Sequence, residues 1–409
     1  MPAFAVTYLV AAPVTLKIRI LHLLRAAVGM IVVAGSWLAI VELTPAANRP
    51  WIGSTTTNNI WDLTIGYNGL GRLTGNEVAG GTHVAGASGS ILRMFDLRML
   101  VDASWLLIAA MAAIAVGLWA IRASARTDRT RAGVIMWGTW LATCVVVFSA
   151  MSGIFHSYYA IELAPAIAAL FGIGASTVWR RRHRRAILIA GIIAFGVTIA
   201  TAVTTFSFNR GFVPWLKWSI LALGVLCLAG WIVFLFLPTA HRDKQWTPRV
   251  LAFVTVLTCL SGPAAFSVST ALSGHAGSTV SAGPNGAGRH LSRRFNCAPL
   301  VSMLIENSAS FTWVAASGSA RIPEGCQLAT GHPVMSIGGF YGKDPAVTLR
   351  QFTTFVKEHR VHYYLEYPGK TSKAKDPAAQ IQAWVRTHYA TRQVGGISVY
   401  DLSTAPTEN

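Results

Sequence analysis

The residues best suited to chemistry lie in a short turn between two apolar stretches, at residues 152–165. The turn holds His156, Tyr158, Tyr159 and Glu162, at what we expect to be the outer boundary of a membrane. Ionisable groups at membrane depth are costly and are often functional. Taken alone, the two tyrosines fit ordinary interfacial belt residues. His156 and Glu162 together instead indicate contact with a phosphate or sugar, because His156 can donate to a phosphate oxygen and Glu162 can orient it or accept from a hydroxyl.

A long glycine-rich segment at residues 44–102 holds a second set of candidates. Asp62 and Glu77 offer carboxylates, and Arg72 and Arg93 offer cations. Transfer of a sugar to a hydroxyl needs a carboxylate base, and a lipid-phosphate leaving group needs a cation or strong donors. For each of these residues taken singly, a solvated loop position is the alternative interpretation. No Asp-Glu or Glu-Asp pair occurs in the chain.

The loop Gly338–Asp344 is a third candidate, because it follows an expected strand and precedes an expected helix. Loops in that position often bind ligands in α/β folds. A tight turn with a helix start at Asp344-Pro345 explains the same residues without a ligand. The sequence contains no His/Cys cluster with zinc-ligand spacing and no Gly-x-Ser-x-Gly motif. We therefore predict neither a metal ligand set nor a cofactor, and we assign no catalytic residue.

The composition indicates that these candidates belong to a membrane protein. Of 409 residues, 53% are hydrophobic and 12% are charged, whereas soluble domains average about 25% charged residues. The mean hydropathy is +0.48. A net charge of +18 would suggest nucleic acid as a partner of a soluble protein. Here the basic residues form short clusters between apolar runs, which is typical of topology signals, so we expect the lipid bilayer and no nucleic acid as partner.

Seven continuous apolar stretches are long enough to cross a bilayer as helices, since a span needs roughly 20 residues. Their apolar residues do not alternate with polar ones, which argues against a barrel. The stretches are Ala26–Leu43, Ala103–Ile121, Gly133–Phe155, Tyr158–Trp179, Ala186–Phe206, Trp218–Leu237 and Val250–Leu272.

Basic residues concentrate in alternate connections between these stretches, at 17–25, 122–131, 180–185 and 242–249. The positive-inside rule places these connections in the cytoplasm. With seven spans that start inside, the segment 44–102 and the C-terminus lie outside. We therefore predict a multi-pass protein of the plasma (inner) membrane with an extracytoplasmic C-terminal domain.

The chain after the last span is expected to hold a small α/β domain. Residues 1–272 form the predicted transmembrane domain, residues 273–289 a Gly/Ser-rich linker, and residues 290–409 the external domain. Cys297 and Cys326 both lie in this domain, where oxidation is permitted, so they form either a disulfide or two unpaired thiols. The expected elements are a helix over 299–307, strands over 311–316 and 334–338, a helix over 346–359, a strand over 361–367, a helix over 378–389 and a strand over 395–402.

Five segments together resemble a known family. They are residues 66–77 (GYNGLGRLTGNE), 152–170 (SGIFHSYYAIELAPAIAAL), 311–316 (FTWVAA), 333–344 (PVMSIGGFYGKD) and 394–403 (VGGISVYDLS). They look like bacterial relatives of protein O-mannosyltransferases and lipid A aminoarabinose transferases, which are membrane glycosyltransferases of the GT-C class. Such enzymes take a sugar from a polyprenyl-phosphate donor and transfer it on the outer face of the membrane. Ser157 stands where the family pattern has proline.

The resemblance implies roles for only a few residues. It implies a donor-side contact for His156, Tyr158 and Tyr159, and a cavity wall for the segment from Tyr67 through Asn68 to Arg72. Members of the family have more spans than this chain, and their catalytic acid lies in the first external loop. By that comparison the chain begins partway through the family pattern, at the short apolar run Ala3–Leu16.

Two hypotheses follow from the sequence. The first is a glycosyltransferase that uses a polyprenyl-phosphate-linked sugar, present as its C-terminal part and inactive alone, with a missing N-terminal half or a partner subunit supplying the base. The second is a non-catalytic membrane partner or remnant whose external domain binds glycan or another envelope component.

Overall fold

The computed structural model describes residues 1–55, 57–76, 78–79, 82–83, 89–237, 246–273, 282–284, 296–320, 322–366 and 376–406. Most of the predicted linker 273–289 and the candidate Glu77 lie outside these residues. The chain divides into two compact units. The first unit comprises Met1–Met30, Gly89–Ala150 and Phe155–Leu291, and the second comprises Ile31–Ser88, Met151–Ile154 and Ser292–Asn409.

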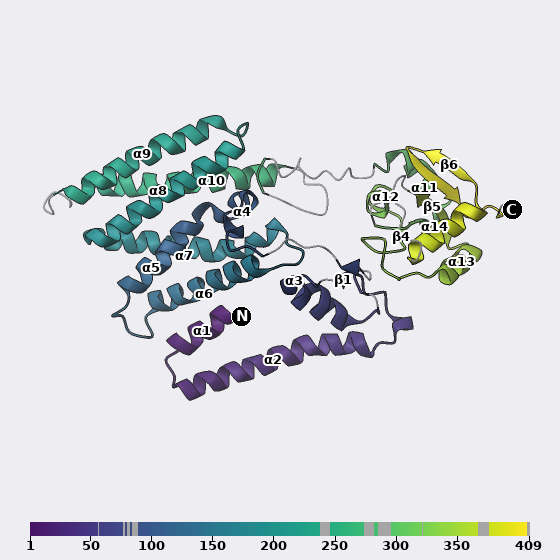
Figure 1. Ribbon diagram of the computed structural model, residues 1–409, viewed down its shortest axis with the longest axis horizontal. Helices are drawn as coiled ribbons and strands as arrows, with labels where there is room; N and C mark the ends of the chain where they lie inside the picture. Colours follow the sequence, from purple (N-terminus) through teal and green to yellow (C-terminus); the bar gives the residue numbers. More distant parts are fainter. Residues whose placement is uncertain are drawn as a thin grey trace. The chain divides into compact units, whose positions relative to one another are not determined.

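Six helices among the described residues are long and apolar enough to cross a membrane (Figure 1). This confirms the predicted polytopic α-helical membrane domain. The expected stretch 103–121 forms a shorter apolar helix, composed of the 3-10 turn η4 (Ser104–Leu106) and α5 (Leu107–Ala120). The six are α2 (Leu16–Leu43), α6 (Arg129–Ala150), the 3-10 helix η5 (Ser157–Leu163) continued by α7 (Ala164–Arg180), α8 (Arg185–Phe208), α9 (Pro214–Phe236) and α10 (Thr247–Leu272).

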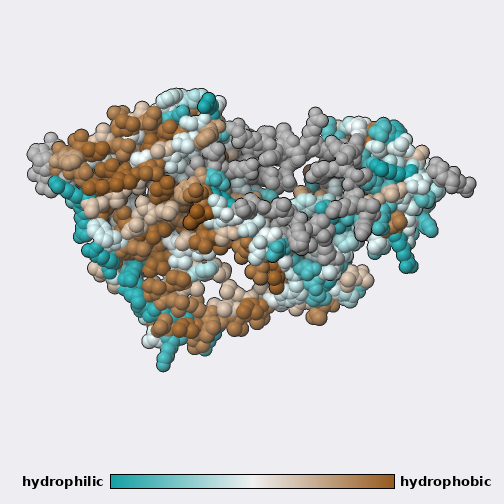
Figure 2. All heavy atoms as spheres, in the orientation of Figure 1, coloured by the Kyte–Doolittle hydropathy of each residue, from teal (hydrophilic) through white to brown (hydrophobic). Residues whose placement is uncertain are grey.

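Small residues allow these helices to pack closely. A side chain on Gly174 of α7 would begin 2.6 Å from the Cβ atom of Ala113 on α5, and one on Gly224 of α9 would begin 3.0 Å from Ile199 on α8. Close backbone approach at glycine is the usual basis of helix packing in lipid, where the hydrophobic effect between helices is lost. The outward surface stays apolar: Figure 2 shows hydrophobic residues covering the helices, and Leu226 of α9 is 67% exposed.

Shorter elements occupy the N-terminus and the connection between α2 and α5. Helix α1 (Pro2–Ala11) precedes α2 and packs against α6. The connection contains η1 (Ala46–Asn48), the π-helix η2 (Asp62–Leu70), α3 (Gly71–Thr74), β1 (Val78–Ala79), β2 (Thr82–His83), η3 (Arg93–Phe95) and α4 (Leu97–Asp102).

A five-stranded mixed sheet forms the centre of the C-terminal domain, with strand order β4-β3-β5-β7-β6. Strands β4, β3 and β5 are parallel, and β7 and β6 add antiparallel neighbours. The predicted small α/β domain is confirmed. The strands are β3 (Trp313–Ser317), β4 (Val334–Ser336), β5 (Val361–Glu366), β6 (Thr391–Val394) and β7 (Ile397–Asp401).

Helices cover both faces of this sheet, and β5 alternates its side chains between them. Tyr364 packs with α13 and α14, whereas Tyr363 and Leu365 pack with the helices of the opposite face. Cys326 of α12 is bonded to Cys297 on that opposite face. The helical elements of the domain are η7 (Ala298–Leu300), α11 (Val301–Ile305), η8 (Ser308–Ser310), α12 (Pro323–Thr330), α13 (Leu349–Lys357) and α14 (Pro377–His388).

The expected helix start at Asp344-Pro345 is wrong. Helix α13 begins at Leu349, because Thr348 and Gln351 form a reciprocal capping box in which each side chain accepts from the other residue's backbone N–H. A capping box satisfies two amide groups that a bare helix end leaves unpaired. Asp344 therefore does not cap α13, and its carboxylate instead accepts a hydrogen bond from the backbone N–H of Ser54.

An ion pair between the largely buried Glu366 and the half-exposed Arg386 lies at the end of β5. The Glu366 carboxylate accepts from Arg386 Nε and from the Tyr400 hydroxyl, each at 3.0 Å. Burial favours the neutral acid, but the hydrogen bonds from Arg386 and Tyr400 outweigh it, so the pKa of Glu366 falls below its ordinary value of 4.5. A lowered carboxyl pKa stabilises the folded state above about pH 4.5, and that contribution is lost as the pH falls through the folded-state pKa.

Replacing Glu366 by glutamine is expected to lower the unfolding free energy of the C-terminal domain by about 1–3 kcal/mol at neutral pH. The variant should also lose less stability than the parent chain between about pH 5 and pH 3. Urea unfolding of the full chain in detergent, followed by proteolysis of the C-terminal domain, measures both effects. Glu358→Gln is the matched control, since Glu358 and Arg360 form an exposed pair at 3.6 Å. If the parent chain and Glu366→Gln lose the same stability on acidification, the lowered pKa of Glu366 in the folded state is contradicted.

Candidate functional site

The turn between α6 and α7 gathers three of the residues singled out in the sequence. The His156 ring stacks on Tyr158 with centroids 5.1 Å apart and planes 8° from parallel. Tyr159 lies edge-on to both rings, at 5.6 Å from His156 and 5.0 Å from Tyr158. His156 is the N-cap residue of η5, so the cluster stands at the very start of a membrane-spanning helix.

Glu162 is the fourth residue of this turn that the sequence singled out. It lies at the end of η5 with an exposed side chain. Its backbone carbonyl accepts a hydrogen bond from Trp140 Nε1 at 2.9 Å. The exposed carboxylate is therefore available to solvent or to a ligand.

Arg93 contacts both the end of α6 and the residues that lead into the turn. The sequence did not suggest this structural role. Its side chain is 5% exposed. Its Nη1 atom donates to the carbonyl of Phe148, in the last turn of α6, at 2.6 Å. Its guanidinium carbon lies 4.8 Å from the centre of the Phe155 ring, which is packed in turn against Tyr159 at 5.7 Å. A cation at a helix C-terminus complements the helix dipole and satisfies a carbonyl without an intrahelical partner.

Asp102 is a carboxylate that sequence reasoning missed. Burial raises its pKa, against hydrogen bonds from the Ser157 side chain and from the backbone N–H of Ala282. The Ala282 bond, to Oδ1, is 2.8 Å long. Within the described part of the chain, the buried Oδ2 atom has no hydrogen-bond partner. An acid with a raised pKa beside the His156 turn is a candidate for proton transfer.

Tyr67 and Arg72, which the family resemblance suggested as part of a cavity wall, contact each other in the second unit. The Arg72 guanidinium carbon lies 4.8 Å from the centre of the Tyr67 ring. Arg72 Nη1 also donates to the carbonyl of Ile154 at 3.2 Å, and the backbone N–H of Gly153 donates to the carbonyl of Arg72 at 3.0 Å. These bonds hold the segment against residues 152–154. Asn68, between them in the chain, is exposed.

The structure describes only one of Asp62 and Glu77, the two acids that the sequence singled out in the long segment. Asp62 is exposed, and its carboxylate accepts a hydrogen bond from the Thr57 hydroxyl. Glu77 lies outside the described residues. Across the ranges that the structure describes, no group of three or more His, Cys, Asp or Glu side chains is placed to hold a metal ion.

The loop Gly338–Asp344 contacts its own domain and also Ser54, in the connection between α2 and α5 of the same unit. Asp344 is 5% exposed, and its Oδ2 atom accepts from the backbone N–H of Ser54 at 2.9 Å. Burial raises the pKa of Asp344, and the hydrogen bond from Ser54 opposes that rise. Gly339 adopts φ +65° with Asp344 Oδ2 only 2.2 Å from where a Cβ atom would stand, so this position requires glycine.

The carboxyl ends of β3 and β5 form a topological switch point. The chain leaves β3 through α12 on one face and leaves β5 through α14 on the other. Ligands of open α/β sheets bind at such points. Here the buried Tyr364 hydroxyl lies 3.7 Å from the Cβ position of Gly318. The neighbouring loop after β4 presents the half-exposed rings of Phe340 and Tyr341, 5.0 Å apart.

A bundle of apolar helices with an aromatic-histidine turn at a helix start, followed by a small α/β domain, is the architecture of a multi-pass membrane protein. Proteins with similar sequences are named as putative mannosyltransferases. Residues 300–388 match the family model described as "Putative mannosyltransferase YkcB-like, C-terminal". The chain is 28% identical to "Putative mannosyltransferase YkcB" of Bacillus subtilis (strain 168), over 89% of this chain and 64% of that protein.

A second relative from the same organism, "Putative mannosyltransferase YycA", is 24% identical over 94% of this chain and 67% of its own length. The chain thus spans 64% and 67% of the two relatives' lengths. These similarities confirm the resemblance to bacterial membrane glycosyltransferases of the GT-C class. No solved structure matches the chain.

Proposed function

We propose that this chain acts in a membrane glycosyltransferase that transfers a sugar, in the first instance mannose, from a polyprenyl-phosphate donor to an acceptor on the outer face of the membrane. The observation that carries the proposal is the cluster of His156, Tyr158 and Tyr159 at the start of a membrane-spanning helix. The names of the two relatives support mannose as the sugar.

The chemistry of the cluster suits a lipid-linked phosphate. A polyprenyl tail keeps its phosphate at the membrane interface, where η5 begins. His156 and the tyrosine hydroxyls are hydrogen-bond donors to phosphate oxygens, and a donor directed at the leaving phosphate stabilises the charge that develops there. Two carboxylates lie near the cluster. The exposed Glu162 is close to it in the sequence, and the half-buried Asp102 contacts Ser157. We propose that Asp102 fixes the position of the turn through its hydrogen bond with the Ser157 side chain.

The same proposal includes the orientation of the chain in the membrane. Arginines 180–185 at the far end of α7 favour a cytoplasmic position for that end. The His156 turn and the C-terminal domain then lie outside the plasma membrane, where a disulfide between Cys297 and Cys326 is chemically stable.

Replacing His156 by alanine is expected to reduce labelling by a photoactivatable polyprenyl-phosphate mannose analogue about tenfold, which corresponds to one charge-assisted hydrogen bond of roughly 1.5 kcal/mol. The analogue is added to membranes that contain the full chain, and cross-linked peptides are mapped by mass spectrometry. His183→Ala is the matched control, because His183 is an exposed histidine in the turn after α7. Labelling that is unchanged in His156→Ala would overturn the donor contact.

A second candidate function is a non-catalytic membrane protein whose C-terminal domain binds glycan. The observation in its favour is the switch point, where aromatic rings for sugar stacking stand beside the carboxyl ends of β3 and β5. The same experiment separates the two functions. Cross-links in residues 152–163 support the glycosyltransferase, whereas cross-links confined to residues 337–347 support glycan binding.

A further inference from the structure

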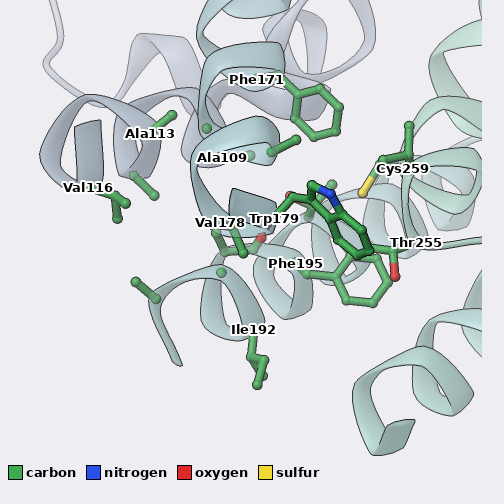
Figure 3. Close-up of a pocket in the computed structure, with 18 of the residues that line it drawn as sticks. Ala109, Ala113, Val116, Phe171, Val178, Trp179, Ile192, Phe195, Thr255 and Cys259 are labelled. Atoms are coloured by element: carbon green, nitrogen blue, oxygen red, sulfur yellow. Dashed lines mark hydrogen bonds between the residues drawn. The ribbon is translucent and has the colours of Figure 1, made fainter. Parts of the chain in front are cut away.

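A pocket of about 140 Å³ lies within the helical bundle, between α5, α7 and α8, with α9 and α10 completing its wall (Figure 3). A cavity of this size holds a small apolar molecule such as benzene. Alanine and glycine at many wall positions create the space. They include Ala112, Ala113, Gly174, Ala175, Gly191 and Ala252.

The wall offers almost no free polar group to an occupant. Thr255 donates to the carbonyl of Leu251 at 2.7 Å and accepts from Trp231 Nε1 at 2.9 Å. Thr198 donates to the carbonyl of Ala194 at 2.8 Å. A pocket whose hydroxyls are already bonded to backbone favours a hydrocarbon occupant over a sugar or a nucleotide, because a polar ligand would lose hydrogen bonds to water without replacement.

A strongly basic turn borders one end of the pocket. Trp179, in the last turn of α7, lines the pocket in Figure 3, and the guanidinium carbon of Arg182 lies 4.4 Å from the centre of its ring. Arg182 Nη1 donates to the carbonyl of Trp179 at 3.0 Å. Among the described residues, the buried Arg182 Nε atom has no hydrogen-bond partner. A buried donor without an acceptor is costly, and an anionic oxygen would satisfy it.

No acidic residue close to this turn in the sequence offsets its positive charge. Residues 180–185 contain five arginines, and neither aspartate nor glutamate occurs between Glu162 and Asp243. Basic sites at the ends of transmembrane helices attract anionic lipid headgroups. The apolar pocket and the basic turn at its end are therefore complementary to one class of molecule, which has a hydrocarbon chain and a phosphate.

We propose that the pocket binds a short segment of one acyl chain of an anionic glycerophospholipid, with the phosphate held by Arg182 and the adjacent arginines. The polyprenyl-phosphate donor is a separate ligand, because the proposed donor contact at His156 precedes α7 and the pocket lies toward its other end. Helix α7 has 17 residues, and at 1.5 Å per residue it separates the two ends by roughly 25 Å. The inference does not depend on the proposed transferase activity.

The test is native mass spectrometry of the full chain, purified in mild detergent after incubation with vesicles of phosphatidylglycerol or phosphatidylcholine. We expect retained phosphatidylglycerol and at least tenfold less phosphatidylcholine. The double variant Ala112→Leu/Ala175→Leu fills the pocket and should reduce the retained phosphatidylglycerol at least fivefold. Ala115→Leu is its matched control, since Ala115 lies on the same helix, is exposed and does not line the pocket.

A second measurement covers the case in which the double variant does not fold. Added phosphatidylglycerol should raise the thermal midpoint of the parent chain, and Arg182→Gln should remove most of that rise while Arg129→Gln, at the exposed start of α6, keeps it. Equal retention of the two lipids by the parent chain would overturn the proposal, as would equal retention of phosphatidylglycerol by the parent chain and a folded Ala112→Leu/Ala175→Leu variant. An equal thermal response in Arg182→Gln and Arg129→Gln would do the same.

Discussion

Loss of the Cys297–Cys326 disulfide is expected to lower the unfolding free energy of the C-terminal domain by about 3–4 kcal/mol. The two cysteines are 29 residues apart, and the bond removes the closure entropy of that loop from the unfolded chain. Both side chains are also buried in the core between the sheet and α11–α12, at 3% and 0% exposure. The midpoint of thermal unfolding should fall by on the order of 15 °C.

Graded-temperature proteolysis of the full chain in detergent measures this effect, with the variant Cys297→Ala/Cys326→Ala and with the parent chain under reductant. Cys144→Ala is the control, because Cys144 is a free cysteine within α6. Reductant should shift the parent and the control alike and leave the double variant unchanged. If reductant shifts neither, the disulfide does not stabilise the domain.

Replacing Arg93 by methionine is expected to weaken the packing of the His156 turn by about 3.5–5 kcal/mol, which is the sum of a charged hydrogen bond and a desolvated cation–π contact. Methionine approximates the volume of the arginine stem but cannot donate to the Phe148 carbonyl or attract the Phe155 ring. The last turn of α6 then loses its cap, and the aromatic contacts from Phe155 to Tyr159 lose their support. Photolabelling by the donor analogue should fall at least as far as in His156→Ala.

The physical cause is tested by hydrogen exchange of the peptide that covers the end of α6 and the turn. Exchange should accelerate there in Arg93→Met and not in Arg122→Met, the matched control, since Arg122 makes a comparable cation–π contact with Trp119 from an exposed position. Unaltered exchange combined with reduced labelling would instead assign Arg93 a direct part in ligand binding. Unaltered exchange and unaltered labelling would contradict both roles.

Much of the architecture was predictable because it depends on local pattern. Long apolar runs identify helices in lipid, since the backbone there must satisfy its own hydrogen bonds. Strands β3, β4, β5 and β7 follow short apolar segments between turn residues and lie within the predicted ranges to about two residues. One helix and one strand of the C-terminal domain were missed. Helix α12 buries only Pro323 and Cys326, and β6 is an edge strand with mostly exposed side chains, so neither has a hydrophobic period.

The site was predictable only where its members are neighbours in the chain. His156, Tyr158 and Tyr159 fall within four positions, and Tyr67 and Arg72 share one short helical segment, so local geometry brings each group together. The contacts of Arg93 with Phe148 and of Ser54 with Asp344 join residues 55 and 290 positions apart. Helix and strand periodicity relates only residues that are close in the sequence, so it cannot predict such pairs.

The sequence by itself determined that the chain enters the membrane repeatedly, that an α/β domain follows, and that a histidine with two tyrosines stands at a helix boundary. These properties follow from hydrophobic period and residue type, which act over a few turns of chain. The tertiary structure alone decided that Arg93 lies beneath that boundary, that Asp102 reaches Ser157, and that small residues on separate helices leave a pocket beside an arginine turn. Those arrangements depend on which helices pack together, and packing is set by the complementarity of whole surfaces rather than by any single segment.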